Sequence, residues 1–242
     1  MRAWAVVVAI FVAGCAHEAP KPPPAAPPPE IVRPAPKPEE PDQVQMAGGM
    51  GTLTDDEIAG PFQRRWDDIT RCYTDATERL NYLGGKIEVK LRVAATGDAK
   101  SAFVISSTFG NWDAERCVLT IARELHFAKP HGAGLEAEFT YPIEFHHKRA
   151  VTMWDGDRGV VAVAAKHKRD VSACKQKASN SPTPALTMTV YVVPGGKVAS
   201  AGLSADAPLD DAFGQCLVGK SRAWRFDDPL GKIAKATIGV GE

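Results

Sequence analysis

The sequence predicts an α+β protein built from two tandem modules, each with the order helix, strand, strand, helix, strand and a small antiparallel sheet. Three observations lead to this prediction. Two segments alternate apolar and polar residues; each is followed by a glycine-containing turn and a second strand-like segment; each pair then precedes a helical pattern that contains a cysteine. A chain of 242 residues has room for two such small modules.

The first module opens with a helical pattern whose apolar residues, from Ile58 to Leu80, recur every three or four positions. Thr54 and Glu57 have the spacing of a capping box, and Pro61 can shift the start of the helix. The segments "KIEVKLRV" and "SAFVIS" have the alternation of strands and flank the turn "AATGDAK". A helix follows in "NWDAERCVLTIAREL", and "LEAEFTYPIEF" forms the last strand.

The second module repeats this order with a shorter first helix, about Lys166 to Ala178. The predicted strands are "LTMTVYVV", "VASAGL" and "KIAKATIGV", and "PGGK" supplies the turn. The helix "PLDDAFGQCLVGK" is opened by a proline that suits a first helical turn. Between the modules, "AVTMWDGDRGVVAVAA" predicts two short strands around an Asp-Gly turn.

Matching distances along the chain support an internal repeat. Gly97 precedes Cys117 by 20 positions, and Gly196 precedes Cys216 by 20. An aromatic residue, Phe127 or Phe226, then follows the cysteine after 10 positions. We therefore interpret the globular part as a tandem duplication.

The N-terminal segment has the features of an export signal. Arg2 precedes the apolar run Ala3 to Val12, which is too short for the roughly 20 residues that span a hydrocarbon core. The run ends in Val12-Ala13-Gly14-Cys15, which resembles the lipobox of bacterial lipoprotein precursors. That resemblance implies cleavage after residue 14 and a diacylglycerol on the thiol of Cys15. The alternative is a plain cleavable signal with an incidental cysteine.

The lipoprotein resemblance also implies a location. Because Ala16, and not an aspartate, follows Cys15, we expect sorting to the outer membrane, with the protein facing the periplasm. Inner-membrane retention and surface exposure stay open. The anchor would make the membrane itself a partner through the N-terminal lipid.

The composition of residues 15–52 predicts a spacer. Many of the chain's 19 prolines lie between Pro20 and Pro41, and the segment offers few large apolar groups. Such a run forms either extended polyproline II, reaching on the order of 60–70 Å, or a featureless tether. The domain boundaries that follow are 1–14 for the signal, 15–52 for the linker, 53–148 for the first module and 149–242 for the second.

Four cysteines remain once Cys15 is assigned to lipid. In an exported protein they are expected to form disulfides, and four cysteines allow three pairings. The repeat selects Cys72 with Cys117 and Cys174 with Cys216. A metal site or a redox pair is the alternative, but the chain has no CxxC motif.

Motifs for catalysis, metals and nucleic acids are not found. With 29 basic and 29 acidic residues, the net charge of zero gives no basis for nucleic-acid binding. Adjacent residues such as His146 and His147 point to opposite faces of a strand, so we predict no metal site there. No nucleophile, zinc or nucleotide fingerprint occurs. We therefore predict a protein that is not an enzyme and needs no cofactor.

The pattern of the first module resembles a known family. Cys72-Tyr73, Gly85-Lys86, Gly97, Cys117, Phe127 and Tyr141-Pro142 are similar to the AgmX/PglI-type C-terminal domain of gliding-motility and envelope proteins, itself similar to the C-terminal domain of TonB. The first module matches over about 95 residues. The second is degenerate, since Lys175 replaces the tyrosine and no Tyr-Pro follows its last strand.

The resemblance implies a function in binding. Modules similar to TonB bind partner peptides at a sheet edge. We expect that edge in the last strand of the first module, at Glu136, Glu138, Phe139, Thr140, Tyr141 and Glu144. The partner would be an envelope protein or peptide in a motility, transport or secretion assembly. The alternatives are a structural spacer lipoprotein without peptide recognition and a cell-wall-associated enzyme.

Overall fold

The first helical pattern forms two helices in the computed structural model, which describes residues 50–132, 136–175 and 184–240. Helix α1 (Asp55–Arg64) begins with the predicted capping box: Glu57 N–H donates to Thr54 Oγ1 at 3.3 Å, and Thr54 N–H donates to Glu57 Oε2 at 2.9 Å. Pro61 lies inside α1, and the chain turns at Arg65 before α2 (Trp66–Arg79). The single helix expected from the periodicity is thus divided in two.

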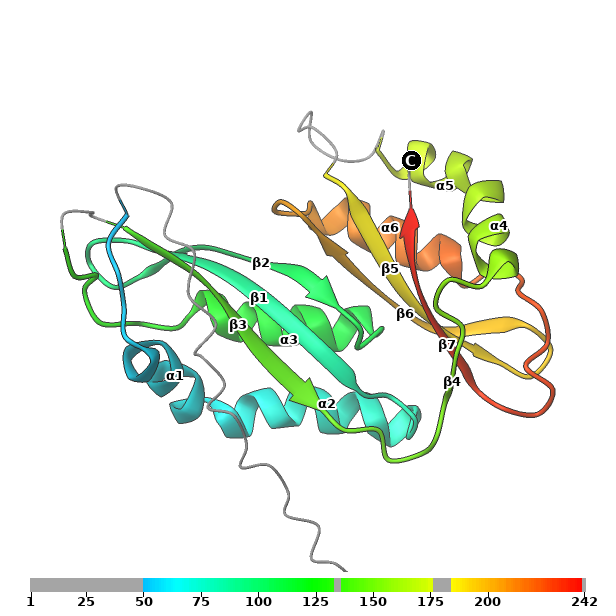
Figure 1. The fold of residues 1–242 in the computed structure, drawn as a ribbon, viewed down its shortest axis with the longest axis horizontal. Coiled ribbons are helices and arrows are strands. Elements are labelled where there is room, and N and C mark those ends of the chain that lie inside the picture. Colours follow the sequence, from blue (N-terminus) through cyan, green and yellow to red (C-terminus); the bar gives the residue numbers. More distant parts are fainter. Residues whose placement is uncertain (1–49, 133–135, 176–183, 241–242) are drawn as a thin grey trace, which may run out of the picture. The chain divides into compact units, whose positions relative to one another are not determined.

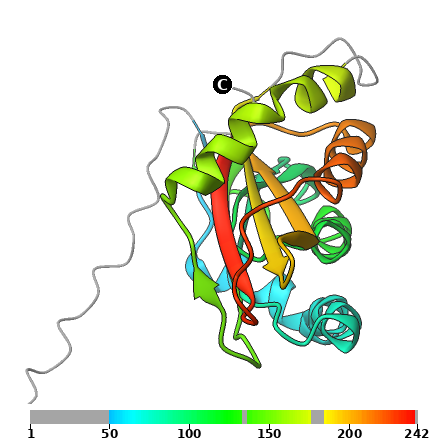
Figure 2. The same cartoon turned by 90° about the vertical axis from the view of Figure 1, so that its right-hand side faces the viewer.

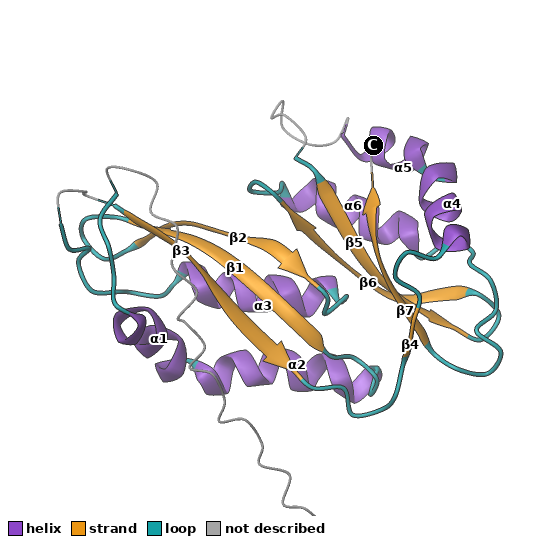
Figure 3. Cartoon of the chain, in the orientation of Figure 1, coloured by secondary structure: helices purple, strands orange, loops and turns teal. Residues whose placement is uncertain are grey.

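The first half contains a three-stranded antiparallel sheet. Strands β1 (Gly85–Val93), β2 (Ala99–Ser107) and β3 (Ala137–Phe145) lie in the order β2-β1-β3. Helices α2 and α3 (Trp112–Arg123) cover one face of this sheet (Figures 1 and 3). The apolar residues of β1 point to that face and are buried, whereas its polar residues lie on the other face, as the alternating pattern predicts.

The second half contains a four-stranded mixed sheet. Strands β5 (Leu186–Val193), β6 (Lys197–Ala205) and β7 (Ala234–Val240) pair antiparallel, and β4 (Thr152–Met153) adds to β7 in parallel. The order is β4-β7-β5-β6, and Figure 2 shows β7 between β4 and β5. Helices α4 (Arg158–Lys166), α5 (Lys168–Lys175) and α6 (Asp211–Ser221) complete this half. The α+β class is therefore confirmed.

Two local predictions in the second half are wrong. The segment "VVAVAA" lies in helix α4 and not in a strand, because the side chain of Asp157 caps that helix by accepting from the N–H groups of Gly159 and Val160. Val160 and Ala164, four positions apart, form its buried face. The proline of "PLDD" precedes the N-cap Asp210 and does not open α6. Helix α5 ends at Lys175, and the predicted continuation to residue 178 lies outside the described residues.

The described residues all belong to one compact unit, in which the two halves share their cores. Strand β6 lies against β2 and α3 without ladder hydrogen bonds to them. Tyr191 of β5 packs in the apolar core of the first half, and Trp112 of α3 packs in that of the second. The indole N–H of Trp112 donates to Gln215 Oε1 at 3.0 Å. No helix within the described ranges is long and apolar enough to cross a membrane.

Candidate functional site

Strand β3 ends the first sheet and pairs with β1 alone. The ends of the other sheet differ from it: β4, which pairs with β7, has only two residues, and β6 lies against β2 and α3. Among the described strands that end a sheet, β3 is therefore a nine-residue strand with β1 as its ladder partner and no strand on its outer side (Figure 1). An unpaired strand of this kind offers backbone groups to another chain.

The register shows which residues of β3 face this open edge. The carbonyl of Lys86 in β1 accepts from Thr108 N–H at 2.8 Å, so the backbone of Lys86 points toward β2. Its partner in β3, Glu144, therefore lies in a pair without hydrogen bonds, and the backbone of Glu144 points outward. The direction of the backbone groups alternates from residue to residue along the strand. The residues whose backbone groups point to the open edge are therefore Glu138, Thr140, Pro142 and Glu144.

Two further observations agree with this assignment. Pro142 has no N–H to donate, and prolines within sheets occur where the nitrogen faces away from the neighbouring strand. The carbonyl of Glu136, two positions before Glu138, accepts from Gly51 N–H at 2.8 Å and not from β1. The open part of the edge therefore runs from Glu138 to Glu144.

The side chains of β3 alternate between two environments. Phe139 is buried on the helix side, and the ring of Tyr141 stacks on Phe62 of α1 with ring centroids 3.8 Å apart. Partial burial raises the pKa of the Tyr141 hydroxyl. Thr140 and Glu144 are exposed on the opposite face. Of the predicted edge residues, Phe139 and Tyr141 thus hold the strand against the helices. Glu136 and Glu138 are half-buried, and Thr140 and Glu144 face solvent.

Charged pairs cover the outer face of the sheet beside this edge. Glu138 pairs with Lys90 at 2.7 Å, and Glu136 pairs with Arg92 at 3.2 Å and with Lys100. The hydrogen bond from Lys100 lowers the pKa of Glu136. Glu144 has no ion pair among the residues described. The face next to the open edge is therefore polar, with one unpaired carboxylate near its end.

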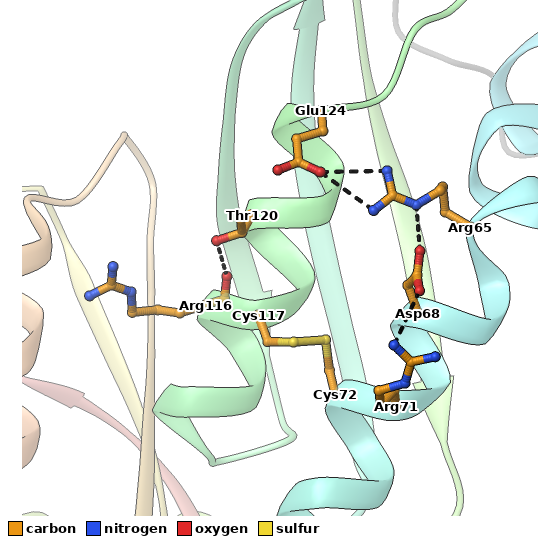
Figure 4. Close-up of polar contacts among 8 residues, drawn as sticks. All are labelled: Arg65, Asp68, Arg71, Cys72, Arg116, Cys117, Thr120 and Glu124. Carbon is orange, nitrogen blue, oxygen red and sulfur yellow. Dashed lines mark hydrogen bonds and ion pairs between the residues drawn. A yellow bond between two sulfur atoms is a disulfide. The ribbon is translucent and has the colours of Figure 1, made fainter.

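A disulfide between Cys72 and Cys117 joins helices α2 and α3 (Figure 4), which confirms the predicted pairing. The guanidinium of Arg65 adds a second connection, since it contacts Asp68 of α2 at 2.6 Å and Glu124, the residue directly after α3, at 3.4 Å. Cys117 is exposed. The bridge lines a groove of about 530 Å³, which α2, the start of α3 and β6 form together.

The second predicted disulfide is also present. Cys174 in α5 bonds to Cys216 in α6, 42 positions further along the chain. Cys174 is fully buried. The two bridges occupy corresponding places, because each joins the helix before the sheet to the helix after the hairpin.

The two adjacent histidines have different surroundings. Both residues are exposed, but Nε2 of His147 lies 3.3 Å from the ammonium of Lys235 and 3.3 Å from the hydroxyl of Tyr191. Burial and the charge of Lys235 lower the pKa of His147. No group of three or more histidine, cysteine or carboxylate side chains suited to hold a metal occurs across the described ranges.

Sequence reasoning missed two buried charged residues, Glu115 and Lys235. A signal for each was available. Glu115 lies at helical spacing from the buried Trp112 and Val118, and Lys235 stands between the buried Ala234 and Ala236. The predicted lipid site Cys15 lies outside the described residues.

Comparisons with known proteins gave no match. These comparisons found no protein-family model, no curated protein and no solved structure that matches this chain.

Proposed function

We propose that the protein is a lipid-anchored envelope protein whose β3 edge binds an extended segment of a partner protein. The observation that carries the proposal is the open edge from Glu138 to Glu144, whose outward backbone groups are not used within the described residues. A partner strand added there would gain main-chain hydrogen bonds, and its alternate side chains would supply selectivity.

The charges beside the edge define the kind of partner. A strand next to β3 places every second side chain over the polar face, near Glu138 and Glu144. Glu138 already pairs with Lys90, whereas the exposed Glu144 is unpaired among the described residues. An extended segment with a lysine or arginine opposite Glu144 therefore fits best, because opposite charges across a strand pair stabilise it.

The remaining parts of the proposal come from the sequence. The lipobox-like end of the signal makes Cys15 the anchor, and residues 15–52 would carry the binding module away from the outer membrane into the periplasm. The order of helices and strands in the first half supports the resemblance to TonB C-terminal domains. The second half would be a degenerate copy of the same module in this proposal.

Pro142 favours a second candidate, a structural lipoprotein without peptide recognition. Proline on an outer strand removes one donor from the edge, a device by which proteins prevent unwanted strand pairing. In this alternative the paired charges on the outer face keep the sheet soluble, and the protein acts as a spacer in an envelope assembly.

Photo-crosslinking from Thr140 in living cells distinguishes the two candidates. A photoreactive amino acid at Thr140 of the full chain should capture one discrete partner, identified by mass spectrometry. The same amino acid at Thr120, an exposed position on α3, is the control. Background alone at Thr140, with the protein folded and present in the membrane fraction, would favour the structural role.

A proline substitution then tests the backbone groups directly. Thr140→Pro removes an outward N–H and spares the bonds to β1, so the crosslink formed from a neighbouring probe at Glu138 should disappear while the fold persists. Phe139→Pro should disrupt the pairing with β1 and unfold the first half. Survival of the crosslink in a folded Thr140→Pro variant would refute edge pairing.

A further inference from the structure

Each half of the protein inserts one buried charged side chain into the other half. Glu115 of α3 accepts from the N–H of Leu203 in β6 at 3.0 Å, in addition to Ser107 Oγ at 2.6 Å and Gly110 N–H at 3.1 Å. Lys235 of β7 donates in the opposite direction, to the carbonyl of Gly84 before β1, at 2.8 Å. Both side chains are 1% exposed. We refer to the interface that these contacts form between the two halves as the joint.

Glycines make room for both side chains. A Cβ at Gly202 of β6 would lie 2.1 Å from a carboxylate oxygen of Glu115. A Cβ at Gly85 would lie 2.9 Å from the ammonium of Lys235. The backbone of each half is therefore shaped to receive the charged group of the other.

The charged and titratable groups around Glu115 do not neutralise it. Arg116 lies one position away but pairs with Asp211 of α6 at 2.8 Å. Arg123 lines the same small cavity, and Tyr191 of β5 faces the carboxylate at longer range. Glu115 therefore has hydrogen-bond donors around it but no ion pair among the described residues.

Lys235 is likewise buried without an ion pair in the described part of the chain. The groups that face it are the ring of Tyr191, His147 and, at longer range, Asp155 after β4. His146 acts on His147 in turn. Tyr191 also binds the carbonyl of Gly84, at 2.8 Å. The ammonium of Lys235 and the hydroxyl of Tyr191 therefore donate to the same carbonyl, that of Gly84.

Burial shifts the pKa values of the two groups toward neutral pH. It raises the pKa of Glu115 from 4.5 to about 7, although hydrogen bonds from Ser107 and from backbone N–H groups oppose this. It lowers the pKa of Lys235 from 10.5 to about 8, although Asp155 opposes this. Each group therefore changes charge within reach of ordinary solution conditions.

We propose that the joint is a pH-responsive latch, which is tightest when either Glu115 or Lys235 is neutral and weakest when both are charged. Opening would hydrate both groups and release the N–H of Leu203 on the edge of β6. A raised pKa means that Glu115 stabilises the joint most below pH 4.5 and that this stabilisation is lost as pH rises to about 7. A lowered pKa means that Lys235 restores stability as pH rises from about 8 to 10.5.

Hydrogen exchange of the Leu203 amide tests the acid side of the latch. After correction for the intrinsic exchange rate, the protection of this amide should fall about forty-fold from pH 5 to pH 7. This is the change in the opening equilibrium constant that follows if the pKa of Glu115 is 4.5 in the open joint and about 7 in the closed joint. The amide of Leu91 in the centre of β1 is the internal control. In Glu115→Gln the fall should vanish. Protection that is independent of pH, or that changes equally at Leu91, would overturn the proposal.

Two further measurements keep the proposal testable if Glu115→Gln does not fold. A carbon-13 titration of the Glu115 carboxyl in the unaltered protein should give a midpoint near 7, and a midpoint near 4.5 would overturn the latch. On the alkaline side, the equilibrium constant for urea unfolding should fall about forty-fold more from pH 8 to pH 10 in the unaltered protein than in Lys235→Met. Equal changes in both would also overturn it.

Discussion

The backbone N–H of Phe226 donates to the carbonyl of Gly196 at 3.0 Å. The same bond occurs in the first half, where Phe127 N–H donates to the carbonyl of Gly97 at 2.8 Å. In both places the residue after the helix returns to the turn of the preceding hairpin. The equal spacings along the two halves therefore correspond to one repeated contact.

Gly196→Ala should destabilise the protein strongly. Gly196 has φ of 69°, and a Cβ there would lie 2.0 Å from the carbonyl oxygen of Phe226. Its neighbour Gly195 has φ of 81°, with nothing within 4 Å of a Cβ. Gly195→Ala should therefore lower the free energy of unfolding by about 1 kcal/mol, because alanine is strained in the left-handed backbone conformation. Gly196→Ala should lower the free energy of unfolding by about 2 kcal/mol more, because its Cβ must displace the backbone at Phe226.

Urea unfolding of the two single variants measures this difference. Equal losses of stability would mean that the returning chain does not lie against the turn. Gly97→Ala in the first half provides an independent repeat of the test, since its Cβ would lie 2.3 Å from the carbonyl oxygen of Phe127.

Much of the fold was predictable because it depends on local patterns. The alternation in β1 and β5, the cap at Thr54 and the cysteine pairings all follow from residues near one another in sequence or from the repeat. Helix α4 was missed because "VVAVAA" has strand propensity, and the cap from Asp157 together with burial of Val160 decides otherwise.

The joint could not be predicted from local patterns, and the open edge was expected only from the resemblance to TonB C-terminal domains. Leu203 lies 88 positions from Glu115, and Gly84 lies 151 positions from Lys235, so nothing local indicates that these groups meet. The end position of β3 depends on the strand order, with β1 in the centre. Alternation shows which face of a strand is buried, but it does not show which strand lies outermost.

Gly214→Ala and Gly219→Ala should have opposite effects, although both lie in helix α6. Alanine has the higher helix propensity, and a Cβ at the exposed Gly219 meets nothing within 4 Å, so that change should stabilise by about 0.5–1 kcal/mol. A Cβ at Gly214 would lie 2.2 Å from the indole of Trp112. That change should destabilise by about 1–3 kcal/mol, because the helices at the joint must separate.

Urea unfolding of both variants, followed by tryptophan fluorescence, measures these effects. Trp112→Phe provides a further check, since the smaller ring should reduce the cost of Gly214→Ala in the double variant. If Gly214→Ala proves as stable as Gly219→Ala, Trp112 does not pack against α6.

Mild reductant should open the two disulfides in a fixed order. Cys72 and Cys174 are both buried, but Cys117 is exposed beside a groove of about 530 Å³, whereas Cys216 is half-buried. Attack by an external thiol requires access to sulfur, so Cys72–Cys117 should be reduced several-fold faster, on the order of threefold to tenfold. Differential alkylation with mass spectrometry assigns each cysteine, and the urea-unfolded protein, in which both bridges are accessible, is the control. Faster reduction of Cys174–Cys216 would contradict the packing of α5 against α6.

Asp170→Asn should destabilise the second half at neutral pH. One carboxylate oxygen of Asp170 accepts from the indole N–H of the buried Trp224 at 3.0 Å and lies 2.9 Å from His167, and the other lies 3.4 Å from Lys220. Removing the charge of Asp170 from this cluster should lower the free energy of unfolding by about 1–3 kcal/mol. Asp75→Asn, at an exposed position of α2, should change stability by less than about 0.5 kcal/mol.

The same cluster predicts how the effect of Asp170→Asn depends on pH. Burial alone would raise the pKa of Asp170, but the hydrogen bonds from Trp224, His167 and Lys220 outweigh it and lower the pKa. A carboxylate with a lowered pKa stabilises the folded state above the pKa of the unfolded chain, near 3.8, and loses this contribution as pH falls through the folded value. The difference in unfolding free energy between Asp170→Asn and the unaltered protein should therefore be constant from pH 5 to 7. It should shrink below pH 4, and a difference that persists undiminished to pH 2 would show that the charge of Asp170 does not stabilise the cluster.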